Sequence, residues 1–383
     1  MAEEGLEMNE QSLNLVKRSF KEFYFKHTNY VETPNRIEER EFGYMQFNGG
    51  MIRHLSFKNN GELSAHFLKH IPSDVYYSCA YYINPTAPMQ EKIFKGADLI
   101  FDIDIDELAL ICAKDHEMWI CNHCKNVMGE KQECGKCNSM KVEKISLTCD
   151  NCIDAGKGEL KKLIKFLQED LGIQENEIKI YFSGNQGFHL HIYNTELESL
   201  DPHSRADIAD YVMGNNILPD SFGVRKNSHL VKDVISKFPN IDDFGWRGRI
   251  SRQLMKDDKA KPRTVQKILK AGYLRFKTEL DDIAREIGAH IDPKVTMDIH
   301  RVFRMQGTLN SKSGLMKAPC NAIDTFDPLT NACVLTDEEV LVNVRYSPKF
   351  RLKERFFGPF NDQKVKLPTY AAVYLICKGL AEV

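Results

Sequence analysis

Apolar residues recur along the chain at two spacings, and these predict both helices and strands. The helical spacing predicts one helix over residues 11–26 and another over residues 160–172. Residues 41–57 are strand-like and are interrupted by an Asn-Gly-Gly turn at residues 48–50, which indicates a hairpin. Residues 205–240 mix helical and loop patterns. The chain therefore reads as a mixture of both kinds of element.

Strict alternation predicts a strand over residues 99–106, in which apolar side chains alternate with Asp102, Asp104 and Asp106. Carboxylates repeated along one strand face repel each other, and divalent cations among the oxygens relieve that repulsion. Mg²⁺ or Mn²⁺ bound in this way serves phosphoryl and nucleotidyl transfer. The alternative is an edge strand whose acids keep it soluble.

A second strand, predicted over residues 178–183, leads into a polar turn flanked by two glycines. The exposed amides of such a turn and the hydroxyl of Ser183 suit phosphate oxygens. Alternation after the turn places His189 and His191 on one face of a further strand. An ordinary hairpin with structural histidines is the alternative.

Composition describes an ordinary globular protein. The chain has 383 residues, of which 42% are hydrophobic and 28% charged, with a formal net charge of −2. This length predicts two or three structural units, and the charge balance means that any nucleic-acid contact must come from local patches. Residues 1–7 lack the pattern of a signal peptide, and no apolar run approaches the roughly 18 residues of a membrane span. We therefore expect an intracellular protein without a membrane partner.

The richest local patch of positive charge is the segment from Trp246 to Lys277. It carries eleven Lys and Arg residues, and its acids are Asp257 and Asp258. Such a segment can follow a phosphate backbone. A solvated helical face is the alternative.

Cysteine spacing predicts metal binding, since three Cys-x-x-Cys pairs fall within 32 residues of a chain that we expect in a reducing compartment. The first two pairs have the spacing of a zinc ribbon and could present four sulfurs to one Zn²⁺. They are Cys121, Cys124, Cys134 and Cys137. The third pair needs two more ligands for a second zinc, and the candidate set is Cys112, His116, Cys149 and Cys152. His123 competes as a ligand, and Cys112 could be a buried strand residue. We expect these sites to be structural.

A third cluster of charged residues begins at Asp292. One acid followed by Arg301, Arg304 and Lys312 supplies a candidate metal ligand and then cations for a triphosphate. Either Asp292 or Asp298 could instead cap a helix.

Several motifs in one order make a specific resemblance. They are Phe-Asp-Ile-Asp from Phe101, the cysteine-rich segment, Ser-Gly-x-x-Gly-x-His from Ser183, Gly-Trp-Arg-Gly-Arg from Gly245, Ile-Asp-x-x-Val-Thr-x-Asp-x-x-Arg from Ile291 and Lys-Ser-Gly-Leu from Lys312. The chain resembles the catalytic small subunit of archaeal and eukaryotic DNA primases, and the archaeal form more closely. The likeness spans most of the chain, from residues 40–43 and 52–57 to residues 367–370.

The resemblance implies a site in which Asp102, Asp104 and Asp292, rather than Asp298, hold two Mg²⁺ or Mn²⁺ ions. It also implies nucleotide-binding roles for Ser183, His189, Arg301 and Lys312. Arg53, on the second arm of the predicted hairpin, is a further candidate for nucleotide binding, and an ordinary surface residue is the alternative. The chain departs from the family pattern in two places. Gln186 stands where members often have arginine, and Asn310 where they usually have histidine, so the phosphate site has one cation and one imidazole fewer.

The expected fold is α/β, with the mixed-sheet catalytic core of archaeo-eukaryotic primases. We expect this core in residues 1–110 and 153–383, a helical insertion around residues 200–285 and a zinc-binding insertion at residues 111–152. The resemblance implies de novo synthesis of short RNA primers on a single-stranded DNA template, for DNA replication. It also implies ribonucleotide or deoxyribonucleotide substrates and a heterodimer with an iron–sulfur large subunit.

Three other functions compete with primer synthesis. A repair or gap-filling polymerase of the same superfamily would share the acids but extend only existing ends. A zinc-ribbon nucleic-acid-binding protein would have lost catalysis, which the presence of Asp102, Asp104, Asp292 and Lys312 argues against. A metal-dependent phosphohydrolase would need an open water site.

Overall fold

The computed structural model describes residues 8–256 and 260–383. The chain divides into two units. The first comprises the residues up to 157 together with 179–200 and 298–383, and the second comprises 158–178 and 201–297. Several sheets and many helices confirm the expected α/β class. The described residues do not include 1–7 or three residues of the basic segment, namely Asp257, Asp258 and Lys259.

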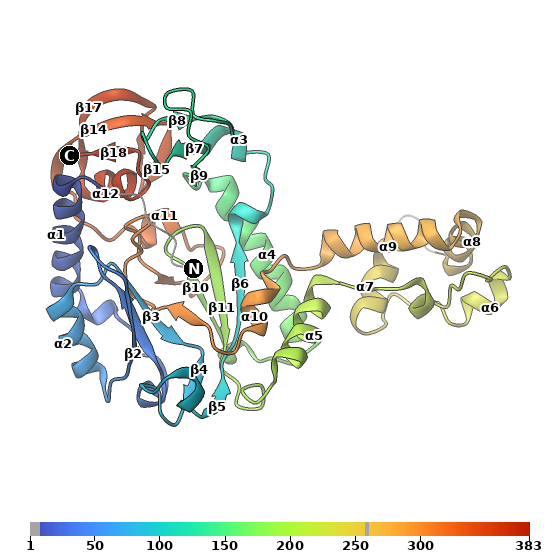
Figure 1. Ribbon diagram of the computed structural model, residues 1–383. Helices are drawn as coiled ribbons and strands as arrows, with labels where there is room; N and C mark the ends of the chain where they lie inside the picture. The colour runs from blue at the N-terminus through green and yellow to red at the C-terminus, as the bar shows by residue number, and fades with distance from the viewer. Residues whose placement is uncertain (1–7, 257–259) are drawn as a thin grey trace. The chain divides into compact units, whose positions relative to one another are not determined.

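The sheet that carries the acidic strand has the order β13-β10-β11-β6. Its strands are β13 (Ala318–Pro319), β10 (Ile178–Phe182), β11 (Gly187–Ile192) and β6 (Leu99–Asp104), and β6, β10 and β11 lie side by side in Figure 1. Strand β6 ends earlier than predicted, because residues Ile105–Glu107 form a 3₁₀ turn in which the Leu108 amide bonds to the Ile105 carbonyl at 3.1 Å. Asp106 is therefore off the strand, and the prediction of three acids on one strand face was wrong for this residue.

Strand β6 is also more buried than a two-faced surface strand. Phe101 and Ile103 are fully buried, and Asp102 is only 9% exposed. Strand β6 is the end strand of its sheet, as the alternative interpretation expected, but an acid buried to this extent does not serve solubility.

A second sheet has the order β12-β3-β1-β2. Its strands are β12 (Val302–Arg304), β3 (Asp74–Ser78), β1 (Phe42–Met45) and β2 (Met51–Leu55). Strands β1 and β2 form the predicted antiparallel hairpin. Helix α2 (Asn60–His70) contributes Leu63 and Phe67 to a buried cluster with Phe42, Val75 and Tyr77 of this sheet.

Further elements complete the first unit. The predicted N-terminal helix is confirmed as α1 (Glu10–Lys26), and every residue of α12 (Thr369–Cys377) is buried. The remaining strands are β17 (Phe360–Pro368), β14 (Glu339–Ser347) and β18 (Ala381–Glu382) in one sheet, β15 (Phe350–Leu352) with β16 (Arg355–Phe357), and β4 (Ala80–Tyr82) with β5 (Phe94–Ala97). The cysteine-rich region folds as α3 (Ala113–His116) and a sheet of β8 (Val127–Met128), β7 (Glu117–Cys121) and β9 (Val142–Ser146). A short helix, α11 (Pro328–Asn331), also belongs here.

The second unit is helical. The helix predicted from residue 160 is part of α4 (Asp150–Glu169), which begins ten residues earlier. The other helices are α5 (Pro202–Met213), α6 (Val231–Ile235), α7 (Gly245–Leu254), α8 (Lys261–Ala271), α9 (Tyr273–Ile287) and α10 (Pro293–Met297). Trp246 stacks on Phe166 at 5.0 Å between ring centroids and donates its indole N–H to the Tyr211 carbonyl at 2.7 Å. None of the described helices combines the length and apolar character needed to cross a bilayer.

Candidate active site and metal sites

The two acids of β6 lie opposite the glycine turn and the first histidine. In the antiparallel pair of β6 with β11, Asp102 is opposite His189 and Asp104 is opposite Gly187. The Nε2 atom of His189 is 3.5 Å from Oδ1 of Asp102. A Cβ atom at Gly187 would lie 2.6 Å from the Ile103 carbonyl oxygen and 3.3 Å from Oδ1 of Asp104. Glycine therefore lets β11 approach the acidic strand closely.

His189 lies in a positively charged, largely buried environment, with 12% of its side chain exposed. Its Nδ1 atom is 3.0 Å from Nζ of Lys317, and its ring is 6.3 Å from that of His191, which confirms that the two imidazoles share a face. Burial lowers the pKa of His189 well below its ordinary range, and the charges of Lys317, Arg304 and Arg301 add to that effect. The imidazole is therefore neutral at pH 7.

Lys317 is a site residue that the sequence analysis missed. Burial and the nearby Arg304 lower its pKa to about 7, and Asp102 opposes this shift. The available signal was a lysine within the apolar run Leu315-Met316-Lys317-Ala318, where a charged side chain is out of place.

The glycine turn after β10 packs on the loop that carries Lys312. Gly184 has φ +86°, and a Cβ there would lie 3.1 Å from Cβ of Asn310. Ser313 donates its hydroxyl to the Gly184 carbonyl, so the two loops are hydrogen-bonded. Asn310 in turn accepts the Lys312 amide on its side-chain oxygen at 2.9 Å. The structure thus brings the Ser183 and Lys312 loops together beside the acidic strand.

A buried cation supports this turn from the C-terminal part of the chain. Lys378 donates to Oδ1 of Asn185 at 2.7 Å, and burial together with the charge of Lys312 lowers the pKa of Lys378 to about 8. Neither Lys378 nor Asn185 was among the predicted site residues.

Arg53 lies on β2 and makes a two-pronged ion pair with Glu41. Its Nε atom is 2.9 Å from one carboxylate oxygen of Glu41, and its Nη2 is 3.2 Å from the other. Burial alone would raise the pKa of Glu41, but hydrogen bonds from Lys92 and Arg53 lower it below its usual value. The nucleotide-binding role of Arg53 stays a prediction.

The two candidates for the third acid both make local backbone contacts. Asp292 belongs to the second unit and accepts the Lys294 amide at 2.9 Å at the start of α10. Asp298 belongs to the first unit and accepts the His300 amide at 3.0 Å. Asp292 therefore has the helix-capping contact that was the alternative to metal binding, whereas Asp298 makes a turn contact with no helix after it. Metal ligation by Asp292 stays a prediction.

The first two cysteine pairs form a four-sulfur group. Their ligand atoms lie within 4.8 Å of one another, and the group consists of Cys121, Cys124, Cys134 and Cys137. The two pairs have the same local fold, because the residue that directly follows each pair donates its amide to the carbonyl of the first cysteine of that pair. Lys125 donates to Cys121 at 2.9 Å, and Asn138 donates to Cys134 at 2.7 Å. Both residues have positive φ, 58° and 55°. The backbone amide of Cys124 lowers the pKa of Cys121 to about 6, which favours the thiolate that a metal such as zinc binds.

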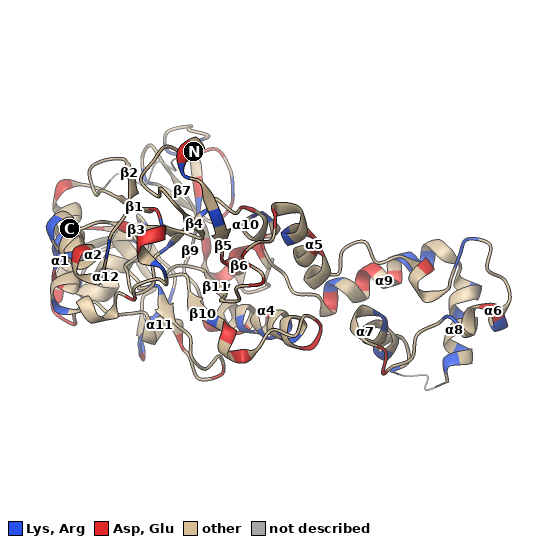
Figure 2. Cartoon of the chain, turned by 90° about the horizontal axis from the view of Figure 1, so that it is seen from below, with Lys and Arg blue, Asp and Glu red and all other residues tan. Residues whose placement is uncertain are grey.

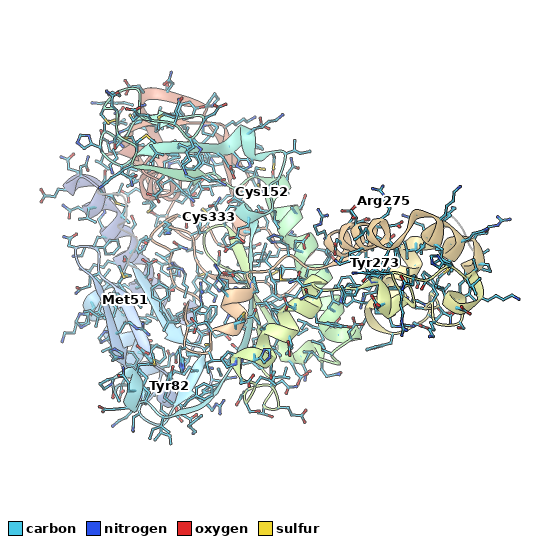
Figure 3. The ribbon with its side chains drawn as sticks, turned by 45° about the vertical axis from the view of Figure 1, so that its right-hand side comes forward. Met51, Tyr82, Cys152, Tyr273, Arg275 and Cys333 are labelled. Atoms are coloured by element: carbon cyan, nitrogen blue, oxygen red, sulfur yellow. The ribbon has the colours of Figure 1, made fainter. Side chains whose placement is uncertain are left out.

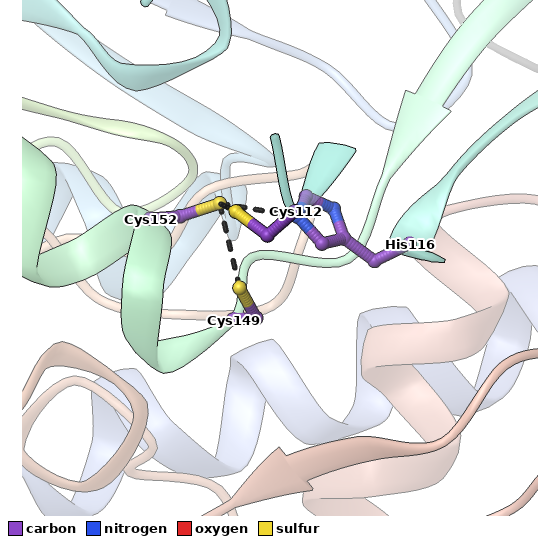
Figure 4. A group of neighbouring side chains, drawn as sticks. All are labelled: Cys112, His116, Cys149 and Cys152. Atoms are coloured by element: carbon purple, nitrogen blue, oxygen red, sulfur yellow. Dashed lines mark hydrogen bonds between the residues drawn. The ribbon is translucent and has the colours of Figure 1, made fainter. Parts of the chain in front are cut away.

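The third pair forms a second group, shown in Figure 4. The ligand atoms of Cys112, His116, Cys149 and Cys152 lie within 4.8 Å of one another. Nε2 of His116 is 3.2 Å from Sγ of Cys152, and its other ring nitrogen is 3.0 Å from the Ser146 hydroxyl. A hydrogen bond of this kind orients the ring of a ligating histidine. This group could hold a second metal ion, and it contains His116 rather than the competing His123.

Residues of the basic segment differ in exposure. Arg249 is buried and pairs with Asp170 at 2.9 Å and with Glu169 at 2.8 Å, so it holds the helical unit together. Lys270 and Arg275 are exposed on α8 and α9; Figure 3 labels Arg275, and Figure 2 shows that α9 carries charges of both signs. The segment is therefore part structural and part exposed cationic surface.

Comparison with known proteins identifies the family. Residues 101–322 match the DNA primase small subunit family. The chain is 43% identical to the DNA primase small subunit PriS of Nitrosopumilus maritimus, over 98% of this chain and all of that protein. It is 41% identical to PriS of Cenarchaeum symbiosum, over 98% and 99% of the two chains, and 31% identical to PriS of Archaeoglobus fulgidus, over 95% and 96%. The chain therefore belongs to the family of DNA primase small subunits, the catalytic subunits of primases that act in DNA replication.

Proposed function

We propose that this chain synthesises short RNA primers de novo on single-stranded DNA. The observation that carries the proposal is the meeting of Asp102 and Asp104 on β6 with His189, the glycine turn and the Lys312 loop within one unit. Membership of the primase small subunit family supports the same reaction.

Asp102 and Asp104 are two residues apart on one strand and so project from the same face. Carboxylate oxygens are the donors that Mg²⁺ and Mn²⁺ prefer, so these acids fit a divalent-cation site, to which we assign Asp292 as the third ligand. Two such cations would supply activation of the attacking 3′-hydroxyl and stabilisation of the pyrophosphate that leaves.

The cationic and polar residues bind the nucleotide in this proposal. Lys312 and Arg301, both exposed, neutralise the triphosphate. The hydroxyl of Ser183 and the neutral imidazole of His189 contribute hydrogen bonds, which compensate part of the charge that Gln186 and Asn310 do not supply. Whether Arg53 joins them depends on its release from Glu41.

We also propose zinc in both Cys/His groups and a heterodimer with an iron–sulfur large subunit. Thiolate with imidazole is a donor set typical of zinc. The relatives are named small subunits, which supports a larger partner. Exposed cations of α8 and α9 would help to hold the template.

The test offers the full chain a single-stranded DNA template, ribonucleotides and Mg²⁺ or Mn²⁺ without a primer. We expect oligonucleotides from the wild type and none from Asp104→Ala, because an acid of the metal site is lost. Asp106→Ala is the matched control, since Asp106 is exposed on the adjacent 3₁₀ turn, and it should keep its activity. Product that requires a supplied primer would point to a gap-filling polymerase, and DNA binding without any product would point to a non-catalytic protein.

A further inference from the structure

Lys317 is a buried lysine whose amine lies between the two histidines of β11. Its side chain is 0% exposed. Nζ is 2.9 Å from the Arg304 carbonyl oxygen, 3.0 Å from Nδ1 of His189 and 3.4 Å from Nε2 of His191. Below its pKa of about 7 the lysine is an ammonium, which has three N–H donors and no acceptor. The three contacts therefore match its three donors.

These contacts decide which nitrogen of His189 carries the proton. Nδ1 faces a donor and so must accept, which in a neutral imidazole leaves the hydrogen on Nε2. On the other side of the ring, Nε2 is 3.5 Å from Oδ1 of Asp102 without a hydrogen bond between them, and the negative charge of that carboxylate favours an N–H at Nε2. The contact with Lys317 at Nδ1 thus selects this tautomer, and the nearby charge of Asp102 favours it.

We propose that Lys317 is a positioning residue that holds His189 in the Nε2–H tautomer, with this N–H directed toward the acidic strand where the nucleotide phosphates bind. The inference deepens the proposed function and rests on it for the role of His189. If a cation neutralised the charge of Asp102, the contact of Lys317 with Nδ1 would still keep the hydrogen on Nε2.

A space-filling role alone does not explain a lysine here. Methionine would fill similar volume without the cost of desolvating an amine, and the lowered pKa of Lys317, caused first by burial, reflects that cost. The arrangement of the three acceptors around Nζ gives the amine a specific use instead.

The direct test is ¹⁵N NMR of the full chain labelled at histidine, with the His189 signal assigned from its loss in His189→Gln. We expect the wild type to show a protonated Nε2 and an unprotonated Nδ1. Lys317→Met with Mg²⁺ bound should show a mixture of tautomers. A wild-type signal from Nδ1–H, or an unchanged signal in the folded variant, would overturn the proposal. This readout does not depend on primer synthesis, so it separates failure of the inference from failure of the proposed function.

A double-mutant cycle adds a functional readout. Lys317→Met should raise the KM for the nucleotide about tenfold, with a smaller effect on kcat, because the hydrogen bond from His189 to the charged phosphates is lost or misdirected. The same substitution in a His189→Ala background should change KM little further, since the ring through which it acts is gone. Equal losses in both backgrounds would show that Lys317 serves only the packing of the core.

Discussion

Asp74 on β3 and Arg304 on β12 form a largely buried ion pair between adjacent strands. Arg304 also donates to the Leu309 carbonyl at 3.2 Å, and Asp74 accepts the Ser311 amide at 3.0 Å. The pair therefore connects the sheet to the loop that precedes Lys312. The triphosphate-binding role proposed for Lys312 needs such an anchored backbone, because the position of the lysine depends on the loop from which it extends.

Substitution of Asp74 by asparagine should destabilise the protein. The change leaves the Arg304 guanidinium buried without a counter-charge, which costs about 3 kcal/mol in the free energy of unfolding. The looser loop should also raise the KM for the nucleotide. Urea unfolding measures the first effect and steady-state kinetics the second.

Lys144→Met is the control for this prediction. It removes a partly exposed pair with Glu117, 2.8 Å apart, and should cost less than about 1 kcal/mol. Equal unfolding midpoints for wild type and Asp74→Asn would contradict the importance of the buried pair.

The same carboxyl predicts a dependence of stability on pH. Burial alone would raise the pKa of Asp74, but Arg304 and the hydrogen bonds from Ser311 lower it below its ordinary value. A carboxyl whose pKa is depressed in the folded state adds stability above its unfolded pKa of about 3.9, and this contribution is lost as the pH falls through the folded pKa. Urea unfolding at pH 7, 5, 4 and 3 should therefore show a steeper loss for the wild type than for Asp74→Asn. Parallel curves would show that Asp74 does not titrate in this way.

Local patterns predicted the parts of the site that depend on local geometry. The spacing of two residues placed Asp102 and Asp104 on one strand face, and the Cys-x-x-Cys spacing indicated the three cysteine pairs of the two candidate metal-binding groups. Such periods are set by the backbone itself, so they can be read from short segments.

Long-range packing decided the rest. Lys317 meets His189 across 128 residues, and no period in the sequence relates the two. Asp106 continues the alternation of the acidic strand, yet the bond from Leu108 to Ile105 turns the chain before it. In the sequence Arg249 resembles the other cations of the basic segment, but in the structure it pairs with Glu169 and Asp170. For Lys317 and Arg249 a contact distant in sequence overrides the local pattern, whereas for Asp106 a local turn does so.

Metal content should distinguish the two cysteine groups. We expect two zinc ions per chain in the wild type, and one in either Cys137→Ser or Cys149→Ser, because each variant removes one thiolate from a closed set of four. Metal analysis of the purified full chain measures this ratio. Cys320→Ser changes a buried thiol outside both groups and should keep two ions. A single ion in the wild type would show that one group serves the fold without metal.

The exposed cations of α8 and α9 should contribute to template binding, in contrast to the buried Arg249. Each phosphate contact on single-stranded DNA adds about 0.7 to the slope of log affinity against log salt. Lys270→Ala with Arg275→Ala should therefore weaken binding of single-stranded DNA and reduce that slope by up to about 1.4, without changing the unfolding midpoint. Arg285→Ala is the matched control, since Arg285 is exposed on the same helix but pairs with Asp282. If the slope of the double variant equals that of the wild type, the template does not follow this surface, because two lost phosphate contacts cannot leave counterion release unchanged.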